Sequence, residues 1–177
     1  KFEWKGVMPA VTTKFTNEDT LDLDLFQVNI KAQLEAGVHG IVLGGTLGEA
    51  STLTEAEKRT LTQETVKMVN GKVPVLINIA EQSTKEAIAA AHHAEEDGAS
   101  GLMMLPPMRY KASDQETEEY FKAVATNTSL PIMVYNNPVD YKIRQRVNPE
   151  GGDPKILGWD AVGEAAENGA DVTQFLV

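Results

Sequence analysis

Five short, continuously apolar runs recur along the chain, separated by longer amphipathic stretches. The runs are "GVMPAV" (6–11), "GIVLGG" (40–45), "VPVLINI" (73–79), "GLMMLP" (101–106) and "LPIMVYN" (130–136). Because they do not alternate with polar residues, they predict strands that are buried on both faces. Their starts lie 28 to 34 residues apart, a spacing that is typical of repeated strand–helix units and a parallel sheet.

The intervening stretches predict helices with recognisable starts and ends. Three hydroxyl residues stand three positions before a glutamate, at the spacing of a capping box: Thr54 with Glu57, Ser83 with Glu86, and Ser113 with Glu116. A glycine follows the expected helix in "LEAGVHG" (34–40), "AEEDGASG" (94–101) and "AENGADV" (166–172). Glycine there supplies the left-handed residue that ends a helix. The recurrence indicates one supersecondary unit used several times.

Repeated βα units fit two α/β folds, a closed (β/α)8 TIM barrel and an open doubly wound sheet. No Gly-x-Gly-x-x-Gly follows the first run, which disfavours the dinucleotide-binding open sheet and favours the barrel. Such barrels take about 250 residues, whereas this sequence has 177. We therefore expect residues 1–177 to form a single, incomplete barrel domain, with about five complete βα units and parts of a later one.

Composition excludes several classes of partner and site. The chain has 26 acidic and 16 basic residues and a net charge of −10, which repels nucleic acids and anionic membranes, so neither is an expected partner. It has no cysteine, which excludes disulfides, thiolate metal sites and cysteine nucleophiles. No signal peptide and no membrane-spanning run are visible, so a cytoplasmic protein is expected.

Small residues follow the second run, where the carboxyl end of a parallel strand would meet a ligand. Gly44, Gly45 and Gly48 allow a ligand to approach the backbone closely. Thr46 adds a hydroxyl that could bind a carboxylate or pass a proton. A plain turn with capping residues explains the same stretch, and the residues alone leave both interpretations open.

Two other strand ends carry candidate side chains. Tyr135 ends the fifth run, where its phenol needs a hydrogen-bond partner; the alternative is a core tyrosine. Arg109 follows the fourth run, where it could meet a substrate carboxylate, and a surface ion pair is its alternative. The three histidines, His39, His92 and His93, do not share a face at ligand spacing, so no metal site is expected.

Several blocks together resemble a known enzyme family. "GGTLGEASTLTEAEK" (44–58) resembles the Gly-Thr-Thr-Gly-Glu signature of the dihydrodipicolinate synthase and N-acetylneuraminate lyase family. "IMVYNNP" (132–138) is similar to that family's Tyr-Asn-x-Pro strand end. "GVMPAVTTKF" (6–15) and "EQSTKEAIAAAHHAEEDGASGLMMLPP" (81–107) fit its other blocks in order. The similarity runs from about residue 5 to residue 142.

The resemblance implies a (β/α)8 homo-oligomer, a dimer or tetramer, that acts on pyruvate or a related 2-oxo acid without a cofactor. A lysine on the sixth strand would form a Schiff base with the keto carbon. By position, Tyr135 matches the tyrosine that relays protons, and Thr46 matches the relay hydroxyl next to it. Gly45, Thr46 and Leu47 match the loop whose backbone amides bind the substrate carboxylate. Glu49 matches the signature glutamate, which the resemblance assigns to fixing the loop.

Three departures from the family pattern affect the expected substrate. Leu47 stands where the signature commonly has a second hydroxyl. Arg109 stands about where the synthases carry a tyrosine used by the neighbouring subunit, with Tyr110 adjacent, and we count both as substrate-binding candidates. Asp140 falls about where an arginine binds the second substrate of the synthases. A lyase, aldolase, dehydratase or deaminase of a 2-oxo or hydroxy acid therefore fits better than a lysine-pathway synthase.

The Schiff-base lysine is not found where the resemblance requires it. The spacing of the earlier strands places the sixth strand near residue 160, and Lys155 would open that strand on the face away from the site. Lys142 comes too soon after the fifth strand. A polar bridge at 143–153, "IRQRVNPEGGD", stands where a strand–helix unit is expected. We expect the lysine to lie outside residues 1–177.

Three functional hypotheses follow. The first is a Schiff-base-forming lyase or synthase of 2-oxo acids. The second is a catalytically inactive relative that binds oxo acids but lacks the lysine. The third is a barrel enzyme that binds phosphate at 44–49, which the absence of any basic residue between Ile41 and Glu57 disfavours.

Overall fold

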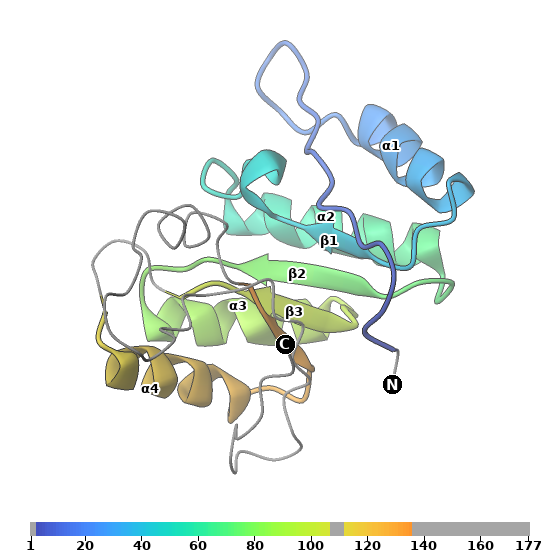
Figure 1. The fold of residues 1–177 in the computed structure, drawn as a ribbon. Coiled ribbons are helices and arrows are strands. Elements are labelled where there is room, and N and C mark those ends of the chain that lie inside the picture. Colours follow the sequence, from blue (N-terminus) through green and yellow to red (C-terminus); the bar gives the residue numbers. More distant parts are fainter. Residues whose placement is uncertain (1–2, 107–111, 136–177) are drawn as a thin grey trace, which may run out of the picture.

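A computed structural model describes residues 3–106 and 112–135. The described residues form a four-stranded parallel sheet in the order β1-β2-β3-β4. The strands are β1 (Ile41–Leu43), β2 (Val75–Ile79), β3 (Gly101–Met104) and β4 (Ile132–Val134). The helices are α1 (Leu23–Glu35), α2 (Glu55–Val69), α3 (Thr84–Glu96) and α4 (Asp114–Ala125). Strand and helix alternate along the sequence (Figure 1).

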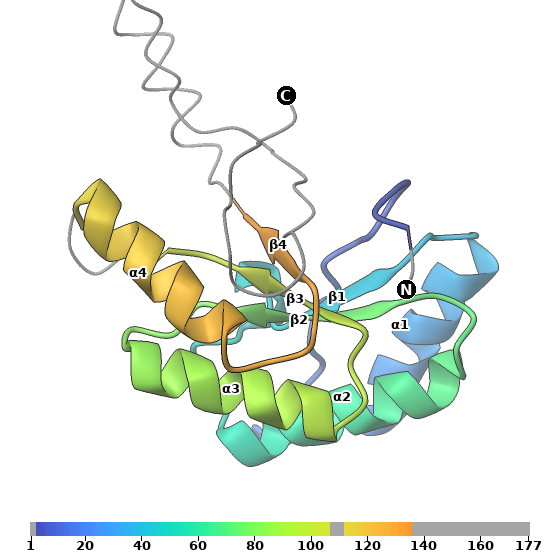
Figure 2. The ribbon, with the colours of Figure 1, turned by 90° about the horizontal axis from the view of Figure 1, so that it is seen from below.

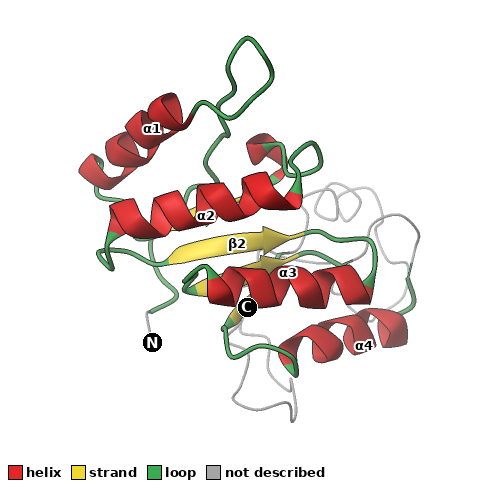
Figure 3. Cartoon of the chain, turned by 180° about the vertical axis from the view of Figure 1, so that it is seen from behind, coloured by secondary structure: helices red, strands yellow, loops and turns green. Residues whose placement is uncertain are grey.

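The placement of the helices distinguishes between the two expected folds. All four described helices lie on one side of the sheet (Figure 2), and α2 and α3 cover it when the molecule is seen from behind (Figure 3). An open doubly wound sheet carries helices on both faces, whereas a barrel carries them only on its outside. Neighbouring strands in the sheet are also consecutive in sequence. The described part of the chain is thus a segment of a (β/α)8 barrel.

The first predicted strand, 6–11, is wrong as a full strand. It forms only an isolated parallel bridge between Ala10 and Val42. The amide of Val42 donates to the Pro9 carbonyl at 2.9 Å, and the amide of Val11 donates to the Val42 carbonyl at 3.0 Å. Pro9 has no N–H to extend the ladder. The segment therefore lies beside β1, as a first barrel strand would.

Counted with that segment, the described residues hold four complete βα units and the strand of a fifth, compared with the expected five. The helix expected after β4, the bridge at 143–153 and the glycine exit at 166–172 all lie outside the described residues.

Two of the three predicted capping boxes are complete. The Glu57 carboxylate accepts from the Thr54 amide at 2.8 Å, and α4 begins with the equivalent Ser113–Glu116 box. At α3 only half forms, because Ser83 accepts from the Glu86 amide at 3.2 Å without the return bond to its own amide. The φ of Ser83 is −124°, whereas Thr54 and Ser113 have −69° and −72°. That rotation turns the Ser83 N–H away from the glutamate.

The described helix ends follow the predicted glycine pattern. Gly37 (φ 77°) and Gly98 (φ 83°) take left-handed conformations directly after α1 and α3. None of the described helices is long and apolar enough to cross a bilayer.

The core lies between the sheet and its helices, in two clusters. One cluster packs β1 and the start of β2 against α1 and α2, and the other packs the end of β2, β3 and β4 against α3 and α4. Ile77 contacts both clusters. The prediction of strands buried on both faces is confirmed for β1, whose three residues are all buried, and only partly for β4, where Met133 and Val134 are partly exposed.

Candidate active site

The loop after β1 turns sharply at the carboxyl edge of the sheet. Gly44 is left-handed (φ 68°) and Gly45 is extended. Residues Thr46–Gly48 form a single 3-10 turn, in which the Gly48 amide donates to the Gly45 carbonyl at 2.9 Å. The amides of Thr46 and Leu47 begin this turn, so no carbonyl of the turn can satisfy them. The loop therefore offers two adjacent backbone donors.

The N-terminal segment supports the loop through contacts with the backbone at Gly48. The Thr13 hydroxyl is buried and donates to the Gly48 carbonyl at 2.6 Å. A Cβ on Gly48 would lie 3.0 Å from the Val11 carbonyl oxygen, so the two backbones approach closely. Thr13 is not among the site residues predicted from the sequence. The feature that could have indicated it is a hydroxyl residue two positions after the first apolar run.

A second support comes from β2. The Asn78 side-chain amide donates to the Gly44 carbonyl oxygen at 2.8 Å. Asn78 is not among the predicted site residues either, although it is the one polar residue in the apolar run 73–79. An amide in a buried strand needs a partner, and that requirement could have indicated it.

Exposure differs sharply along the loop. Gly45 and Gly48 are buried, whereas Thr46 is exposed and Leu47 has 72% of its surface accessible. The Glu49 backbone carbonyl accepts from the amide and hydroxyl of Thr52, at 2.9 and 2.8 Å, which ties the loop to the approach of α2. The structure shows a tight turn, followed by the capped start of α2, and the same turn presents backbone donors and a hydroxyl, so it fits both interpretations left open above.

Tyr135 directly follows β4 and is partly buried. Its amide donates to the Met104 carbonyl at 2.8 Å, which anchors it beside the end of β3. Because all four strands are parallel, Tyr135 and Thr46 both lie at the carboxyl ends of the strands, although β2 and β3 stand between β1 and β4. The structure therefore groups Gly45, Thr46 and Leu47 in one loop and places Tyr135 along the same edge.

Other predicted positions lie outside the described residues. These are Arg109, Tyr110, Asp140, Lys142 and Lys155.

The first cations after the loop are already paired. Lys58 contacts Glu81 at 3.0 Å, and Arg59 donates to both oxygens of Asp97 at 2.8 Å. The hydrogen bond to Asp97 raises the pKa of Arg59. Burial opposes ionisation of Asp97, but the hydrogen bonds from Arg59 and Gln63 outweigh it, so the pKa of Asp97 lies below its usual value. Arg59 thus joins α2 to the end of α3, and Lys58 joins α2 to the segment between β2 and α3. Neither cation is free to bind an anion at the loop.

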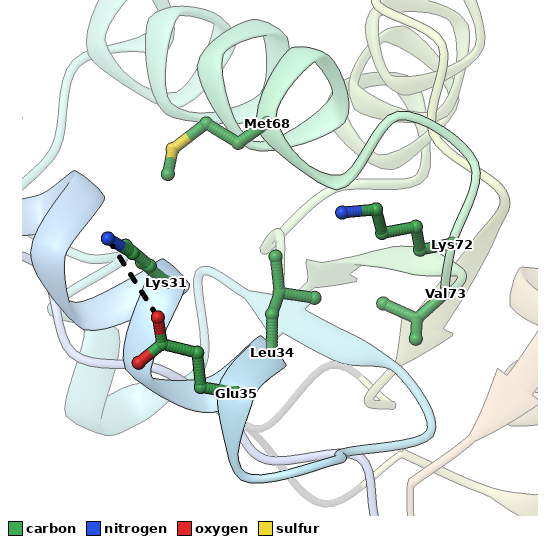
Figure 4. Close-up of a pocket in the computed structure, with 6 residues that line it drawn as sticks. All are labelled: Lys31, Leu34, Glu35, Met68, Lys72 and Val73. Carbon is green, nitrogen blue, oxygen red and sulfur yellow. Dashed lines mark ion pairs between the residues drawn. The ribbon is translucent and has the colours of Figure 1, made fainter.

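A hollow of about 350 Å³ lies at the other end of the sheet. Figure 4 shows its lining, which comes from the last turns of α1 and α2 and the segment before β2: Lys31, Leu34, Glu35, Met68, Lys72 and Val73. Its lining residues come from the segments that lead into β1 and β2, so it lies near the amino ends of these strands. It is therefore separate from the edge that carries Thr46 and Tyr135.

Each histidine contacts a residue from another segment of the chain. His39 Nδ1 accepts from the Val7 amide at 3.0 Å, His92 contacts the Asn127 carbonyl, and His93 contacts Glu55 at 2.7 Å. Within the described ranges, no group of three or more His, Asp or Glu side chains is arranged to hold a metal ion.

The family model described as the Dihydrodipicolinate synthetase family matches residues 3–148, most of the chain. The chain belongs to this family. Among its relatives, the 4-hydroxy-tetrahydrodipicolinate synthase of Bacillus subtilis (strain 168) is 39% identical over 133 residues, 75% of this chain and 46% of that protein. "Probable 2-dehydro-3-deoxy-D-pentonate aldolase YjhH" of Escherichia coli (strain K12) is 33% identical over 136 residues, 77% of this chain and 45% of that protein.

A solved structure of the family has the same fold. The structure of YagE, a prophage protein of the dihydrodipicolinic acid synthase family from Escherichia coli K12, has a TM-score of 0.73 and 33% identity over 77% of this chain and 46% of that one. That structure is a complex with pyruvate. The chain spans about half the length of these relatives. Both the suspected family and the (β/α)8 fold class are confirmed by these comparisons.

Proposed function

We propose that this chain is part of a Schiff-base-forming lyase or synthase that acts on pyruvate or a related 2-oxo acid. The observation that carries the proposal is the match to the family over residues 3–148, which includes both the loop at Gly45–Leu47 and Tyr135. In the structure these residues share the carboxyl edge of a parallel sheet. That edge is where (β/α)8 enzymes hold their substrates.

The proposed chemistry begins with binding of the carboxylate. The amides of Thr46 and Leu47 donate to the oxo-acid carboxylate, and the Thr46 hydroxyl adds a third donor. A lysine amine, which we place outside residues 1–177, attacks the keto carbon. The keto oxygen leaves as water and an imine forms, which accepts the electron pair when an adjacent bond breaks. Tyr135 transfers protons during these steps.

The class of substrate rests on the names of relatives and on the loop itself. One relative is named a synthase and another an aldolase of 2-dehydro-3-deoxy-D-pentonate. In this chain the apolar Leu47 is exposed beside Thr46, so the second position of the signature supplies only its backbone. We propose cleavage, dehydration or deamination of a 2-oxo or hydroxy acid rather than the lysine-pathway condensation. Arg109 and Tyr110 remain candidate substrate-binding residues.

We further propose a homodimer or homotetramer that needs no cofactor, because the family resemblance implies this organisation; a cytoplasmic location stays a prediction. Sedimentation velocity on the purified chain at several concentrations measures the assembly. A single monomeric species over the whole concentration range would contradict the proposed oligomer.

The second candidate is an oxo-acid-binding relative without turnover. The observation that favours it is the sequence at 143–160, where no lysine stands at the end of the expected sixth strand. The phosphate-binding alternative is weakened by the pairing of Lys58 with Glu81 and of Arg59 with Asp97, which commits the nearest cations after the loop.

The decisive experiment is reductive trapping with pyruvate. The protein expressed from the complete coding sequence is incubated with pyruvate and borohydride, and its intact mass and peptide map are measured. The enzyme hypothesis predicts one lysine that carries a reduced pyruvyl group, whereas the binding hypothesis predicts a calorimetric signal with pyruvate but no adduct. Absence of both, with pyruvate and with hydroxylated 2-oxo acids, would contradict the proposed function.

The role of Tyr135 is tested in the same assay. Tyr135→Phe removes the proton-transferring phenol, and we expect imine formation to slow by about 100-fold, the usual contribution of a general acid or base. Tyr120→Phe is the matched control, because the Tyr120 hydroxyl is buried among the helices and has no hydrogen-bond partner among the described residues. Equal rates for the two variants would remove Tyr135 from the mechanism.

A further inference from the structure

Asn78 occupies a distinctive place in the sheet. Its neighbours Ile77 and Ile79 pack into the clusters beneath the helices. Because side chains alternate along a strand, Leu76 and Asn78 lie on the opposite face, which in a barrel is the interior. Asn78 pairs in register with Met103 of β3. It is therefore an amide on an otherwise apolar stretch of the inner face.

The register of β1 and β2 brings Asn78 to the point where β1 leaves the sheet. The last pair of the ladder is Leu43 with Ile77, so Gly44 comes next to Asn78. Gly44 turns to a φ of 68°, and its carbonyl oxygen accepts from the Asn78 side-chain amide at 2.8 Å instead of continuing the ladder.

This hydrogen bond fixes the orientation of a whole peptide unit. The described chain contains no cis peptide bond, so the Gly45 N–H points away from the Gly44 carbonyl. Holding that carbonyl therefore also orients the backbone at Gly45, from which the amides of Thr46 and Leu47 follow directly. The other support, Thr13 on Gly48, acts at the far end of the turn.

The orientation of the Asn78 side chain is also determined. Its Oδ1 is buried and has no hydrogen-bond partner among the described residues. A flipped amide would place that oxygen against the Gly44 carbonyl oxygen, so the two acceptors would repel. A buried acceptor without a donor is unfavourable. The Asn78 amide keeps this orientation nevertheless, which indicates that the hydrogen bond from its donor group to Gly44 is what this position needs.

We propose that Asn78 is a positioning residue for the carboxylate-binding loop. Through the Gly44 carbonyl it sets the direction of the amides of Thr46 and Leu47, and thereby the affinity for the oxo acid. This inference rests on the proposed function for its ligand, but its structural part is independent of that function.

Three substitutions separate hydrogen bonding from shape. Asn78→Leu removes the donor at similar volume, and Asn78→Asp keeps the shape but replaces the donor with an acceptor. Asn127→Leu is the matched control, because the Asn127 side-chain amide also donates to a backbone carbonyl at 2.8 Å, that of Ala123, just after α4. All are made in the full chain, and their thermal midpoints are compared to identify any variant that fails to fold.

Pyruvate affinity and the loop amides are measured together. We expect Asn78→Leu to weaken pyruvate binding about tenfold, as one lost hydrogen bond at a preorganised loop does. It should also shift the amide resonances of Thr46 and Leu47, while Asn127→Leu leaves these resonances unchanged. Asn78→Asp should bind more weakly than Asn78→Leu at neutral pH. It should recover, relative to wild type, in acid, where the new carboxyl gains a proton and can donate to Gly44.

Either of two results would overturn the proposal. One is an Asn78→Asp variant that binds pyruvate as well as wild type at neutral pH, which would mean that shape alone matters. The other is unchanged amide resonances of Thr46 and Leu47 in Asn78→Leu. If wild-type protein binds no pyruvate, the proposed function fails, and the amide resonances alone decide the role of Asn78.

Discussion

Gly44 shows how much of the loop depends on a single backbone conformation. Its φ is 68°, and a Cβ there would meet Asn78 O at 3.8 Å and Ala50 Cβ at 3.9 Å, which are ordinary contacts. Space is therefore available for a side chain, and the requirement for glycine is conformational. A non-glycine residue in this region costs about 1–2 kcal/mol.

We expect Gly44→Ala to lower the free energy of unfolding by about 1 kcal/mol. It should also weaken pyruvate binding, because relief of the backbone strain reorients the loop. Gly37→Ala is the control, since Gly37 has a φ of 77° and nothing within 4 Å of an added Cβ. Urea unfolding should show similar losses for both variants, while calorimetry with pyruvate should show a loss only for Gly44→Ala. Equal affinity in the two variants would contradict a role for the turn in binding.

The link between α2 and α3 is the clearest interaction between elements. Arg59 donates two hydrogen bonds to Asp97 and one to Glu96, and Gln63 adds a bond to Asp97 at 2.7 Å. The Asp97 side chain is only 3% exposed, whereas Glu96 is 62% exposed. The two ion pairs should therefore differ in their contribution to stability, because solvent screens the exposed pair.

We expect Asp97→Asn to cost about 2 kcal/mol at neutral pH, since it places a donor against Arg59 and Gln63. Glu96→Gln should cost less than about 1 kcal/mol. The folded pKa of Asp97 is lowered, so its contribution is complete above the ordinary carboxyl pKa of about 3.9 and is lost as the pH falls through the folded value. Urea titrations from pH 7 to acid should show the difference between wild type and Asp97→Asn shrinking. A difference that grows in acid would contradict this assignment.

At the scale of the whole molecule, stability comes from two hydrophobic clusters that meet on β2. Leu102 at the centre of the sheet is fully buried, whereas Val28 on α1 is 62% exposed. The exposed apolar residues of α1 contribute little in the described chain, because solvent already surrounds them.

We expect Leu102→Ala to lower the free energy of unfolding by about 3 kcal/mol, through lost burial and a cavity. Val28→Ala should change it by less than about 0.5 kcal/mol. Denaturant unfolding followed by circular dichroism measures both variants. A comparable loss for Val28→Ala would show that α1 packs against a further surface in solution.

The sequence by itself determined the order and type of the elements. Helix starts at Thr54 and Ser113 and helix ends at Gly37 and Gly98 depend on local hydrogen bonds and backbone conformation, which a few neighbouring residues fix. The apolar runs also identified the strands, because a strand buried on both faces needs consecutive apolar residues. The exception is 6–11, where Pro9 interrupts the ladder. The family motifs also predicted the loop Gly45–Leu47 and Tyr135 as candidate site residues.

Only the tertiary structure decided what supports that loop. Thr13 and Asn78 lie 35 and 34 residues along the chain from the carbonyls that they bind. Their role depends on the register between strands and on the placement of the N-terminal segment beside β1, and neither is encoded in a local pattern. The same holds for the pairing of Arg59 with Asp97, because packing of α2 against α3 brings together charges that look like solvated surface residues in the sequence. Local chemistry thus fixed the elements, and long-range packing fixed the geometry of the candidate site.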